Sequence, residues 1–388
     1  MIDFTLNFSR INYILLAVNF LIVIYITTFH RCFISKVKNF KAKNGDENIT
    51  TLPAISVIVY CRDNAERLAK LLPQILNQKY DAKFEVIVVN DGSSEDTKDV
   101  FNYLAINHKN LYQTFIPKGA DNISPKKLAL TLGVKASQYE YMVFTNADAV
   151  IDSELWLDSY GKEFAKGKDI VIGNSVPTRE CRKKLSSFIM FDILADRVTT
   201  YSSALFGRIY RCSTYNVGYK KDLFLENKSF SRHINLNYGD DDIFIRLFAN
   251  ASNTSLILDR KSLVECNYTN PRKFHSIMKQ RNIYTRKNTS PFGRNIMAVG
   301  SFATWLWLAT TIAGVILSLP NIIPSIIYFV LCILFWTFTI LAWKKAAKTL
   351  SMQVSAWGMP LFILYRPVYN LIYKLKTHRN RRLFYVLR

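Results

Sequence analysis

Three long apolar runs without a charged residue constrain the fold of this 388-residue chain more than any other feature. They cover residues 11–29, 296–319 and 325–343. At a rise of about 1.5 Å per residue, a helix of such length crosses the hydrocarbon core of a bilayer, which is about 30 Å thick. Inside lipid, only helices and closed barrels satisfy every backbone polar group. The runs therefore predict one transmembrane helix near the N-terminus and a pair in the C-terminal third.

Basic residues beside the runs predict their orientation. They are Arg31, Lys36, Lys38, Lys41 and Lys43 after the first run, and Arg281, Arg286, Lys287, Arg294, Lys344, Lys345 and Lys348 around the pair. Because positive charge marks the cytoplasmic face of a membrane, we expect the N-terminus outside and the middle of the chain in the cytoplasm. Pro320 and Pro324 break the helix between the second and third runs, so we expect a membrane hairpin with its turn outside.

A cleaved signal peptide is the alternative interpretation of the first run. It fits poorly, because Asp3 accompanies Arg10 ahead of the run and no small-residue cleavage site follows. We therefore expect a permanent anchor and an integral protein of the cell inner membrane.

A fourth apolar stretch, residues 352–373, is interrupted by Pro360, Arg366 and Pro367 and leads into a basic tail. If it spanned the membrane, that tail would lie outside, against the preference of positive charge for the cytoplasm. We expect an amphipathic segment at the interface with lipid, and a fourth span is the alternative. The predicted parts are an anchor (1–35), a tether (36–52), a cytosolic domain (53–290), a transmembrane hairpin (291–348) and an interfacial segment with a basic C-terminal tail (349–388).

The formal net charge of +22 raises the possibility of nucleic-acid binding. The positive charges do not gather on one helix or tail, however, and many lie beside the apolar runs. We therefore assign them to the membrane surface, and we expect membrane lipids and no nucleic acid among the partners.

The cytosolic part alternates short apolar runs with helical patterns. Short apolar runs at 55–60, 84–89 and 141–145 predict strands, and the first of them is continuous and β-branched, as expected of a strand buried on both faces. Helical spacing at 65–77, 95–106 and 124–137 predicts helices between them. Strand–helix alternation of this kind indicates an α/β fold, with a mainly parallel sheet and helices on both faces. In such sheets, ligands bind beyond the carboxyl ends of the strands.

Polar residues follow each predicted strand at that edge. They are Arg62, Asp63 and Asn64 after the first strand, Asn90 and Asp91 after the second, and Asn146 and Asp148 after the 141–145 strand; the preceding helix brings Lys126 and Lys127. Carboxylates hold hard divalent cations, and lysines bind phosphate groups. The pattern predicts a site for a nucleotide diphosphate with Mg²⁺ or Mn²⁺.

Five stretches carry a resemblance to a known family. They are VIVVNDGSSEDT (86–97), SPKKLALTLGVKAS (124–137), YMVFTNADAV (141–150), TYNVGYKKDLF (214–224) and GDDDIFIR (239–246). In this order they resemble the motifs of family 2 glycosyltransferases over roughly residues 53–290. The resemblance implies a GT-A-like, Rossmann-type domain. It also implies inverting transfer from a nucleotide-diphospho-sugar, a UDP-sugar by preference, to a glycan or lipid-linked acceptor.

The resemblance also implies roles for residues at the strand ends. Asp63 and Asp91 match positions that contact the base or ribose, beside Arg62, and Lys126 or Lys127 matches the position next to the pyrophosphate. Asp148 matches the metal-ligating second acid of the family's DxD motif. Asn146 stands where the family usually has the first acid, and an amide oxygen ligates a metal without adding charge.

The acidic run 240–242 holds the candidate general base. Matching the family's ED-x-D-L-x-x-R motif places Asp240 in the base position, with Gly239 in place of the usual Glu, whereas a shift of one residue favours Asp241. Adjacent acids repel one another and raise a pKa toward a working value. The alternative is that the acids only cap a helix over 243–249.

Residues 279–284 are similar to the Q-x-x-R-W segment of many membrane members. Gln280 matches, Tyr284 replaces the Trp as a stacking ring, and Ile283 occupies the Arg position, so that Arg281 or Arg286 would supply the acceptor or phosphate contact. The alternative is a basic amphipathic helix on anionic lipid. Two other functions stay open: a catalytically silent scaffold of a glycan-assembly complex, and a processive polysaccharide synthase.

Overall fold

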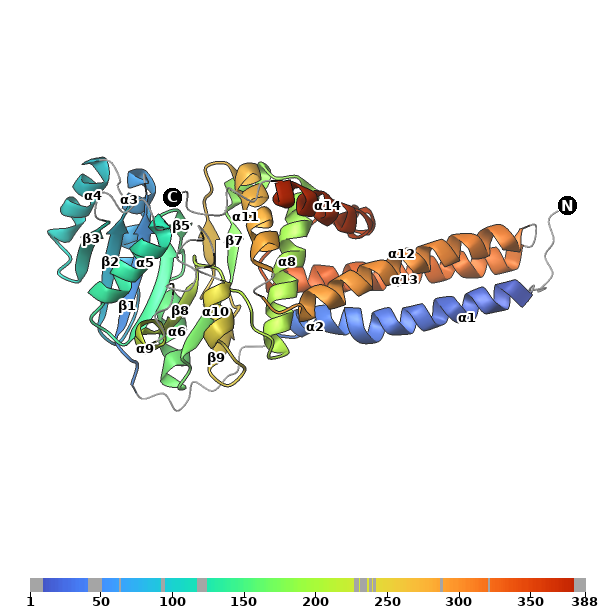
Figure 1. Ribbon diagram of the computed structural model, residues 1–388, viewed down its shortest axis with the longest axis horizontal. Helices are drawn as coiled ribbons and strands as arrows, with labels where there is room; N and C mark the ends of the chain where they lie inside the picture. The colour runs from blue at the N-terminus through green and yellow to red at the C-terminus, as the bar shows by residue number, and fades with distance from the viewer. Residues whose placement is uncertain are drawn as a thin grey trace. The chain divides into compact units, whose positions relative to one another are not determined.

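The computed structural model describes residues 10–40, 51–62, 64–91, 95–116, 124–226, 230, 236, 239, 242–286, 289–319 and 322–379 (Figure 1). The chain divides into two compact units. The first lies within residues 1–40, 187–205 and 291–372, and the second within 41–186, 206–290 and 373–388.

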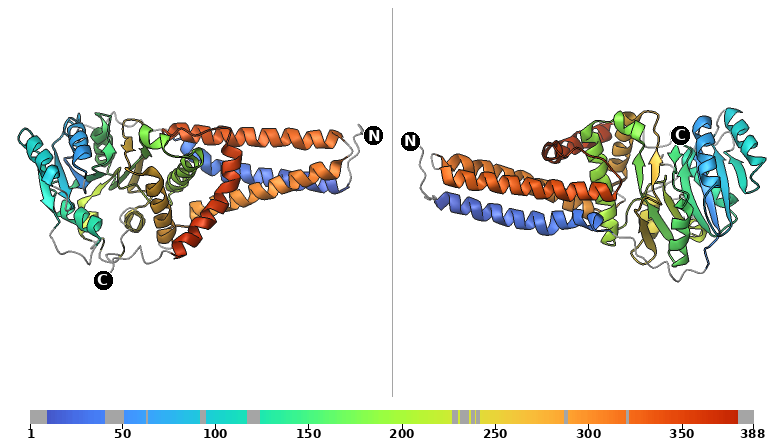
Figure 2. Two further views of the ribbon diagram at one scale, coloured as in Figure 1. Left: turned by 90° about the horizontal axis from the view of Figure 1, so that it is seen from above. Right: turned by 180° about the vertical axis from the view of Figure 1, so that it is seen from behind.

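The first unit is helical. α1 (Arg10–Tyr25) continues through a π-helical turn, η1 (Ile26–Arg31), into α2 (Cys32–Lys38), and α12 (Phe292–Ser318) and α13 (Ile322–Thr349) run beside it (Figure 2).

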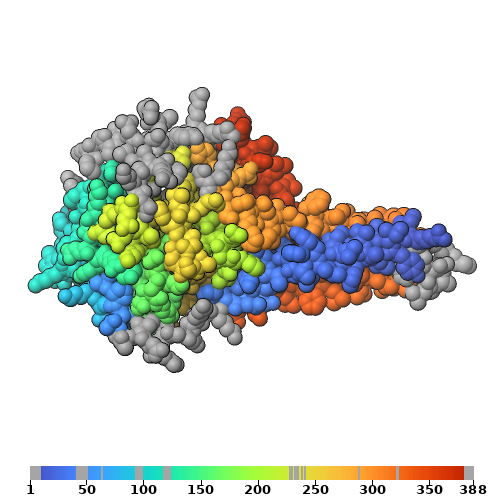
Figure 3. Space-filling model, turned by 60° about the horizontal axis from the view of Figure 1, so that its bottom comes forward, coloured from blue at the N-terminus to red at the C-terminus, as the bar shows by residue number. Residues whose placement is uncertain are grey.

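In the described part of the chain, three helical stretches are long and apolar enough to cross a membrane: Arg10–Lys38, Phe292–Ser318 and Ile323–Thr349. Figure 3 shows the surface of α1 in blue along the orange surface of the hairpin helices. By length and apolar composition, candidate membrane helices are thus found at all three predicted positions.

The first unit also contains α8 (Ser187–Leu205) and residues 359–372 of α14 (Met359–Arg379). Ser202 of α8 donates a hydrogen bond to the carbonyl of Phe33 at 2.7 Å. Asp192 of α8 accepts one from Nε of Arg366 at 2.8 Å and is almost fully buried. The sequence pattern did not predict that residues 187–205 join the membrane helices.

The second unit contains a sheet of seven described strands in the order β3-β2-β1-β4-β8-β6-β9. The strands are β1 (Ile55–Cys61), β2 (Phe84–Asn90), β3 (Leu111–Phe115), β4 (Tyr141–Asn146), β6 (Ile170–Gly173), β8 (Val217–Lys220) and β9 (Thr254–Ile257). β8 runs antiparallel to both of its neighbours, and the other adjacent pairs are parallel. The prediction of a mixed, mainly parallel sheet is confirmed.

Helices cover both faces of this sheet. Alternate residues of β1, including Val57 and Val59, pack in one core with leucines of α3 (Ala65–Leu76). On the opposite face, Gly133 of α5 (Pro125–Ala136) lies so close to β1 that an added Cβ would come within 2.6 Å of the Ile58 side chain. Both helices follow their predicted ranges closely, as does α4 (Glu95–Ala105).

A smaller sheet in the order β5-β10-β7 continues from the end of β4. Its strands are β5 (Ala149–Val150), β7 (Ser175–Pro177) and β10 (Val264–Cys266). The remaining helices of this unit are α6 (Trp156–Ala165), α7 (Arg179–Lys183), α9 (Lys221–Leu225), α10 (Ile243–Phe248) and α11 (Pro271–Thr285).

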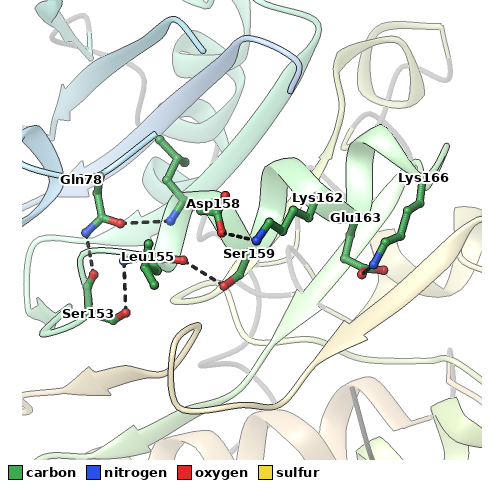
Figure 4. Close-up of polar contacts among 9 residues, drawn as sticks. Gln78, Ser153, Leu155, Asp158, Ser159, Lys162, Glu163 and Lys166 are labelled. Carbon is green, nitrogen blue, oxygen red and sulfur yellow. Dashed lines mark hydrogen bonds and ion pairs between the residues drawn. The ribbon is translucent and has the colours of Figure 1, made fainter. Parts of the chain in front are cut away.

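The segment between β5 and α6 is tied to the end of α3 (Figure 4). Gln78 donates to the carbonyl of Ser153 at 2.7 Å and accepts from the backbone N–H of Leu157 at 3.0 Å. Gln74 accepts from the N–H of Ile151 at 2.8 Å. These bonds to backbone groups hold the residues that follow Asp148 against the C-terminal end of α3.

Candidate functional site

The carboxyl ends of β2, β1 and β4 lie in register at one edge of the large sheet. Cys61 pairs with Asn90, and Tyr60 pairs with Asn146. The backbone N–H of Asp91 then donates to the carbonyl of Cys61 at 2.9 Å. The polar residues that follow the three strands therefore emerge side by side, as parallel pairing requires.

Asp91 is held by its neighbours on β1. The hydroxyl of Tyr60 donates to its Oδ2 at 2.6 Å, and Nη1 of Arg62 lies 3.7 Å from the same oxygen. Burial and the bond to Asp91 raise the pKa of Tyr60, so Tyr60 stays a proton donor. The Asp91 side chain is 11% exposed, which leaves part of it open to a ligand.

The two adjacent lysines of α5 point to different places. Nζ of Lys126 donates to the hydroxyl of Thr214 at 2.8 Å and lies 5.9 Å from the centre of the Tyr60 ring. Nζ of Lys127 donates to the carbonyl of Leu236 at 2.9 Å, and its side chain is 1% exposed. Lys126 is therefore the lysine that shares the strand-end edge with Asp91.

Asp148 is a buried acid at the same edge. Its Oδ2 accepts a hydrogen bond of 2.9 Å from the hydroxyl of Tyr215. Burial raises the pKa of Asp148, and the hydrogen bond from Tyr215 and the positive charges of Arg67 and Lys126 oppose that rise. The carboxyl thus lies within the electrostatic reach of two cations, Arg67 and Lys126.

Tyr215 connects Asp148 with its surroundings. The side chain of Asn146 also hydrogen-bonds to Tyr215. The Tyr215 ring meets Tyr268 edge to face at 6.0 Å, and Tyr268 stacks on Phe274 of α11 at 3.7 Å. The hydroxyl between Asn146 and Asp148 is therefore fixed by an aromatic row that ends on α11.

The residues present fit a divalent cation of the magnesium type. Such ions are bound through one or two carboxylates together with substrate phosphates, and they accept amide oxygens. Asp148 offers a carboxylate, and Asn146 offers an amide oxygen beside it. Within the described ranges no cluster of three histidine, cysteine or acidic side chains is arranged to hold a metal, so substrate oxygens would complete the coordination.

The acidic run is only partly described. Asp240, Asp241 and the predicted nucleotide contact Asp63 lie outside the described residues. Asp242 is the N-cap of α10: its Oδ1 accepts from the N–H of Ile243 at 2.8 Å, and Oδ2 accepts from the hydroxyl of Thr285 on α11. The capping alternative is thus correct for Asp242, which is 1% exposed.

Gly239 stands where the family has Glu, and its geometry suits glycine. Its φ of +106° lies in a region that side chains disfavour. An added Cβ would also come within 2.8 Å of Cδ1 of Ile243. A glutamate at this position would be strained, so the departure from the family motif matches the local backbone.

The predicted acceptor contacts lie on α11. Gln280 is 9% exposed and Arg281 4%. Nε2 of Gln280 donates to the carbonyl of Ser276 of the same helix at 3.3 Å. Tyr284 is half-buried and adjoins Thr285, the residue that bonds to Asp242. Helix α11 thus contacts the start of α10 through Thr285. Its Phe274 also stacks on Tyr268, which packs against Tyr215, the residue that bonds to Asp148.

Sequence reasoning missed the residues that hold the predicted ones. Asp91, Lys126 and Asp148 are contacted or faced by Tyr60, Arg67, Thr214 and Tyr215. Thr214 and Tyr215 lie within the 214–224 motif, whereas Tyr60 and Arg67 had no signal beyond proximity to the strand-end residues. A hydroxyl that orients a carboxylate leaves no periodic trace in a sequence.

Asn216, the asparagine of the 214–224 motif, is structural. It is 0% exposed and donates to the carbonyls of Asn174 and Ser262 at 2.6 and 2.7 Å. Its Oδ1 accepts from Trp156 at 2.9 Å and Tyr160 at 2.7 Å. All of its hydrogen-bonding capacity is used inside the protein.

The fold and the polar residues at the carboxyl ends of β2, β1 and β4 are typical of one class of protein. In this class, α/β domains bind a ligand through acidic and basic residues at the ends of parallel strands. A mannosyltransferase from Pyrobaculum calidifontis, solved with GDP-Man and Mn²⁺, has a similar fold. Its TM-score is 0.51 at 17% sequence identity, and the match covers 88% of this chain and 97% of that one. At this identity, the likeness concerns the fold alone, which is GT-A-like.

Residues 56–227 match the family model of glycosyl transferase family 2. The resemblance to family 2 glycosyltransferases that the motifs carry is therefore confirmed over these residues.

Curated relatives agree with the family assignment. The poly-β-1,6-N-acetyl-D-glucosamine synthase of Staphylococcus aureus is 28% identical over 122 residues, which are 31% of this chain and 28% of that protein. The synthase of the same name from Staphylococcus epidermidis is 32% identical over 101 residues, or 26% of this chain and 23% of that protein. The matched region thus spans less than a third of these relatives.

Proposed function

We propose that this protein transfers a sugar from a nucleotide-diphospho-sugar, a UDP-sugar by preference, to a membrane-associated glycan or lipid-linked acceptor. One observation carries the proposal. Asp91 follows β2 and Asp148 follows β4, the parallel strands on either side of β1, and both emerge at one edge with Lys126, inside the region that matches the family. That edge is where α/β sheets bind nucleotides.

The donor would lie along this edge. Asp91 and Asp63 would contact the base or ribose beside Arg62, and Lys126 would meet the diphosphate. Lys127 is a weaker candidate for the phosphate because its ammonium group already donates to Leu236. The named relatives are synthases of an N-acetylglucosamine polymer, so we place UDP-N-acetylglucosamine first among the donors to test.

Asp148 and Asn146 would hold Mg²⁺ or Mn²⁺, which when bound offsets the charge that develops on the departing diphosphate. The protein's own contribution is to orient the Asp148 carboxylate and to offset part of the cost of burying its charge. Tyr215 donates to it, and Arg67 and Lys126 favour its charged form. Lys126 also supplies positive charge toward the phosphates.

Asp240 or Asp241 would take the proton from the acceptor hydroxyl, which then attacks the anomeric carbon from the face opposite the nucleotide. The sugar's configuration inverts in this single displacement. One base suffices, whereas a retaining double displacement also needs a nucleophilic carboxylate. The residues proposed to meet the acceptor or a phosphate are Gln280, Arg281 and Tyr284 on α11.

We place the protein in the cell inner membrane with its N-terminus outside and the transferase domain in the cytoplasm. The anchor (1–35), tether (36–52), domain (53–290), hairpin (291–348) and interfacial segment (349–388) would bring the domain close to a membrane-bound acceptor. Helix α14 presents exposed apolar side chains at helical spacing, including Leu361 and Val368, and ends in basic residues. These features suit a helix lying in the cytoplasmic interface.

A donor screen tests the proposal. Purified full-length protein in lipid nanodiscs is heated with each nucleotide-sugar in the presence of Mg²⁺ or Mn²⁺, and release of the nucleoside diphosphate is measured with and without membrane extract. We expect one donor to raise the melting temperature, since ligands that bind only the folded state stabilise it, and to be consumed. Binding without turnover for every donor would favour the silent scaffold, and no binding at all would contradict the proposal.

Replacing Tyr215 with Phe is expected to weaken Mn²⁺ binding by about 10- to 100-fold, the usual effect of removing a group that orients a metal ligand. The substitution keeps the ring that packs against Tyr268 and removes the hydroxyl, and with it the hydrogen bonds to Asp148 and Asn146. Titration of free Mn²⁺ by electron paramagnetic resonance measures the affinity directly. Tyr268→Phe is the matched control, and equal affinities in the two variants would show that the hydroxyl of Tyr215 has no such role.

A further inference from the structure

An apolar cavity lies among the membrane helices of the first unit. Its volume is about 610 Å³, and its walls come from α1, η1, α12 and α13. Its lining includes Leu16, Ala17, Asn19, Arg31, Tyr328 and Phe335. Apart from Arg31, the lining carries no charge.

The polar side chains in the wall are satisfied by the protein. Oδ1 of Asn19 accepts hydrogen bonds from Thr310 at 3.0 Å and Thr311 at 3.2 Å, and its Nδ2 donates to the carbonyl of Leu15 at 3.1 Å. The hydroxyl of Tyr328 donates to the carbonyl of Asn12 at 3.3 Å. The interior is therefore suited to a hydrocarbon chain and offers little to water or to a sugar.

Arg31 forms one end of the cavity. Its Nη2 donates to the carbonyl of Phe335 and to the hydroxyl of Thr339, both at 2.8 Å, and its guanidinium lies 4.9 Å from the centre of the Phe335 ring. Its Nε is buried and has no hydrogen-bond partner. None of the described carboxylates forms an ion pair with Arg31.

The backbone at Arg31 is also unusual. Residues Ile26–Arg31 form a π-helical turn, a rare conformation that is often associated with functional sites. A charge within a membrane helix is costly and calls for a partner. A cation without an acidic partner, at the end of an apolar cavity, fits an anionic group that carries a hydrocarbon chain.

We propose that this cavity binds one anionic phospholipid of the surrounding bilayer, with its phosphate on Arg31 and an acyl chain between α1, α12 and α13. From Leu16 to Arg31 the cavity follows α1 for about 22 Å, which exceeds the depth of one leaflet, about 15 Å. The headgroup then lies at the end of the span that basic residues mark as cytoplasmic, where anionic lipids concentrate. This inference is independent of the proposed glycosyl transfer.

Phosphatidylglycerol is the probe for the test. Full-length protein is purified in a neutral detergent, and phosphatidylglycerol or phosphatidylcholine with the same chains is titrated while native mass spectrometry counts bound lipid. We expect one phosphatidylglycerol to bind at least about tenfold more tightly than phosphatidylcholine, because the guanidinium–phosphate contact is charge-assisted. Equal binding of the two lipids would overturn the proposal.

Three variants locate the binding. Arg31→Gln should weaken phosphatidylglycerol binding about tenfold, and Ala17→Phe should reduce binding by filling the cavity. Lys36→Gln removes an equal charge from an exposed position outside the cavity and should leave binding within about twofold of the wild type. If Lys36→Gln weakens binding as much as Arg31→Gln does, the attraction is a general surface effect and the proposal fails.

Two controls separate loss of lipid from loss of folding or from another lipid. Arg31→Lys keeps the charge and should retain most of the binding, and melting curves without lipid report whether each variant is folded. Polyprenyl phosphate is titrated in competition. If it displaces phosphatidylglycerol at equal concentration and binds with the same dependence on Arg31, the site belongs to a lipid carrier and the assignment to a bilayer phospholipid is wrong.

Discussion

Asp240→Asn is expected to lower the rate of sugar transfer by about 10²- to 10⁴-fold, the usual contribution of a general base. Binding of the nucleotide-sugar should change little, because the substitution preserves shape and the donor contacts are proposed to lie at other strand ends. The measurement is the initial rate of nucleoside diphosphate release at saturating donor and acceptor, with donor affinity from thermal shift. If Asp241 is the base, the same loss appears in Asp241→Asn and not in Asp240→Asn.

The structure sharpens this expectation through Asp242. A helix has a single N-cap position, and Asp242 fills it for α10 with one carboxylate oxygen while the other accepts from Thr285. Capping therefore accounts for Asp242 and leaves the two preceding acids without that explanation. Asp242→Ala should lower thermal stability, since loss of an N-cap costs about 0.5–2 kcal/mol.

Asp222→Asn is the matched control for the base variants. Asp222 lies in the same domain, and its side chain is 59% exposed and 4.0 Å from Lys220. Its replacement should leave both rate and stability unchanged. The assignment of a base to the acidic run is wrong if Asp240→Asn and Asp241→Asn both retain wild-type rates in an assay where the donor is consumed.

The arrangement of the sheet could be predicted because local patterns determine it. The expected strand 55–60 is observed as Ile55–Cys61, and the expected helix 124–137 as Pro125–Ala136. Continuous β-branched residues are typical of buried parallel strands, and Ser124 followed by Pro125 is typical of a helix start. Once the strands are parallel, their carboxyl ends must meet, and this alone predicted that the residues after β2, β1 and β4 share one edge of the sheet.

Other features depend on contacts between distant residues and could not be predicted. Helix α8 has an apolar composition compatible with either unit, and its position follows from partners such as Phe33 and Arg366 that are far away in the sequence. The bond from Tyr215 to Asp148 joins residues 67 positions apart. Likewise, the two lysines of α5 are equivalent in the sequence, and only the fold separates Lys126 from the buried Lys127.

Asp148→Asn is expected to abolish metal-dependent stabilisation by the donor and to reduce transfer by more than about 100-fold, because loss of a direct metal ligand exceeds the effect of losing its hydrogen-bond partner. Asparagine keeps an oxygen that can accept from Tyr215, so the local packing is preserved. With Asn146 beside it, the variant site has no carboxylate at either position of the motif. Melting temperatures with donor and increasing Mn²⁺, together with transfer rates, measure both effects. A variant that keeps its response to Mn²⁺ would show that the cation binds elsewhere.

The same variant should be more stable than the wild type at neutral pH when metal and donor are absent. Burial raises the pKa of Asp148 in the folded state, so the folded protein binds this proton more tightly than the unfolded chain. The stability that protonated Asp148 contributes is then lost as the pH rises through its folded-state pKa, and a neutral asparagine avoids this loss. The difference in melting temperature should shrink as the pH falls below the folded-state pKa, where the wild-type carboxyl is itself neutral. If Asp148 serves to bind a metal, the protein should gain stability when the acid is replaced in the absence of metal, and the wild type should gain stability when metal binds. If Asp148 serves only the fold, its replacement should lower the stability of the protein.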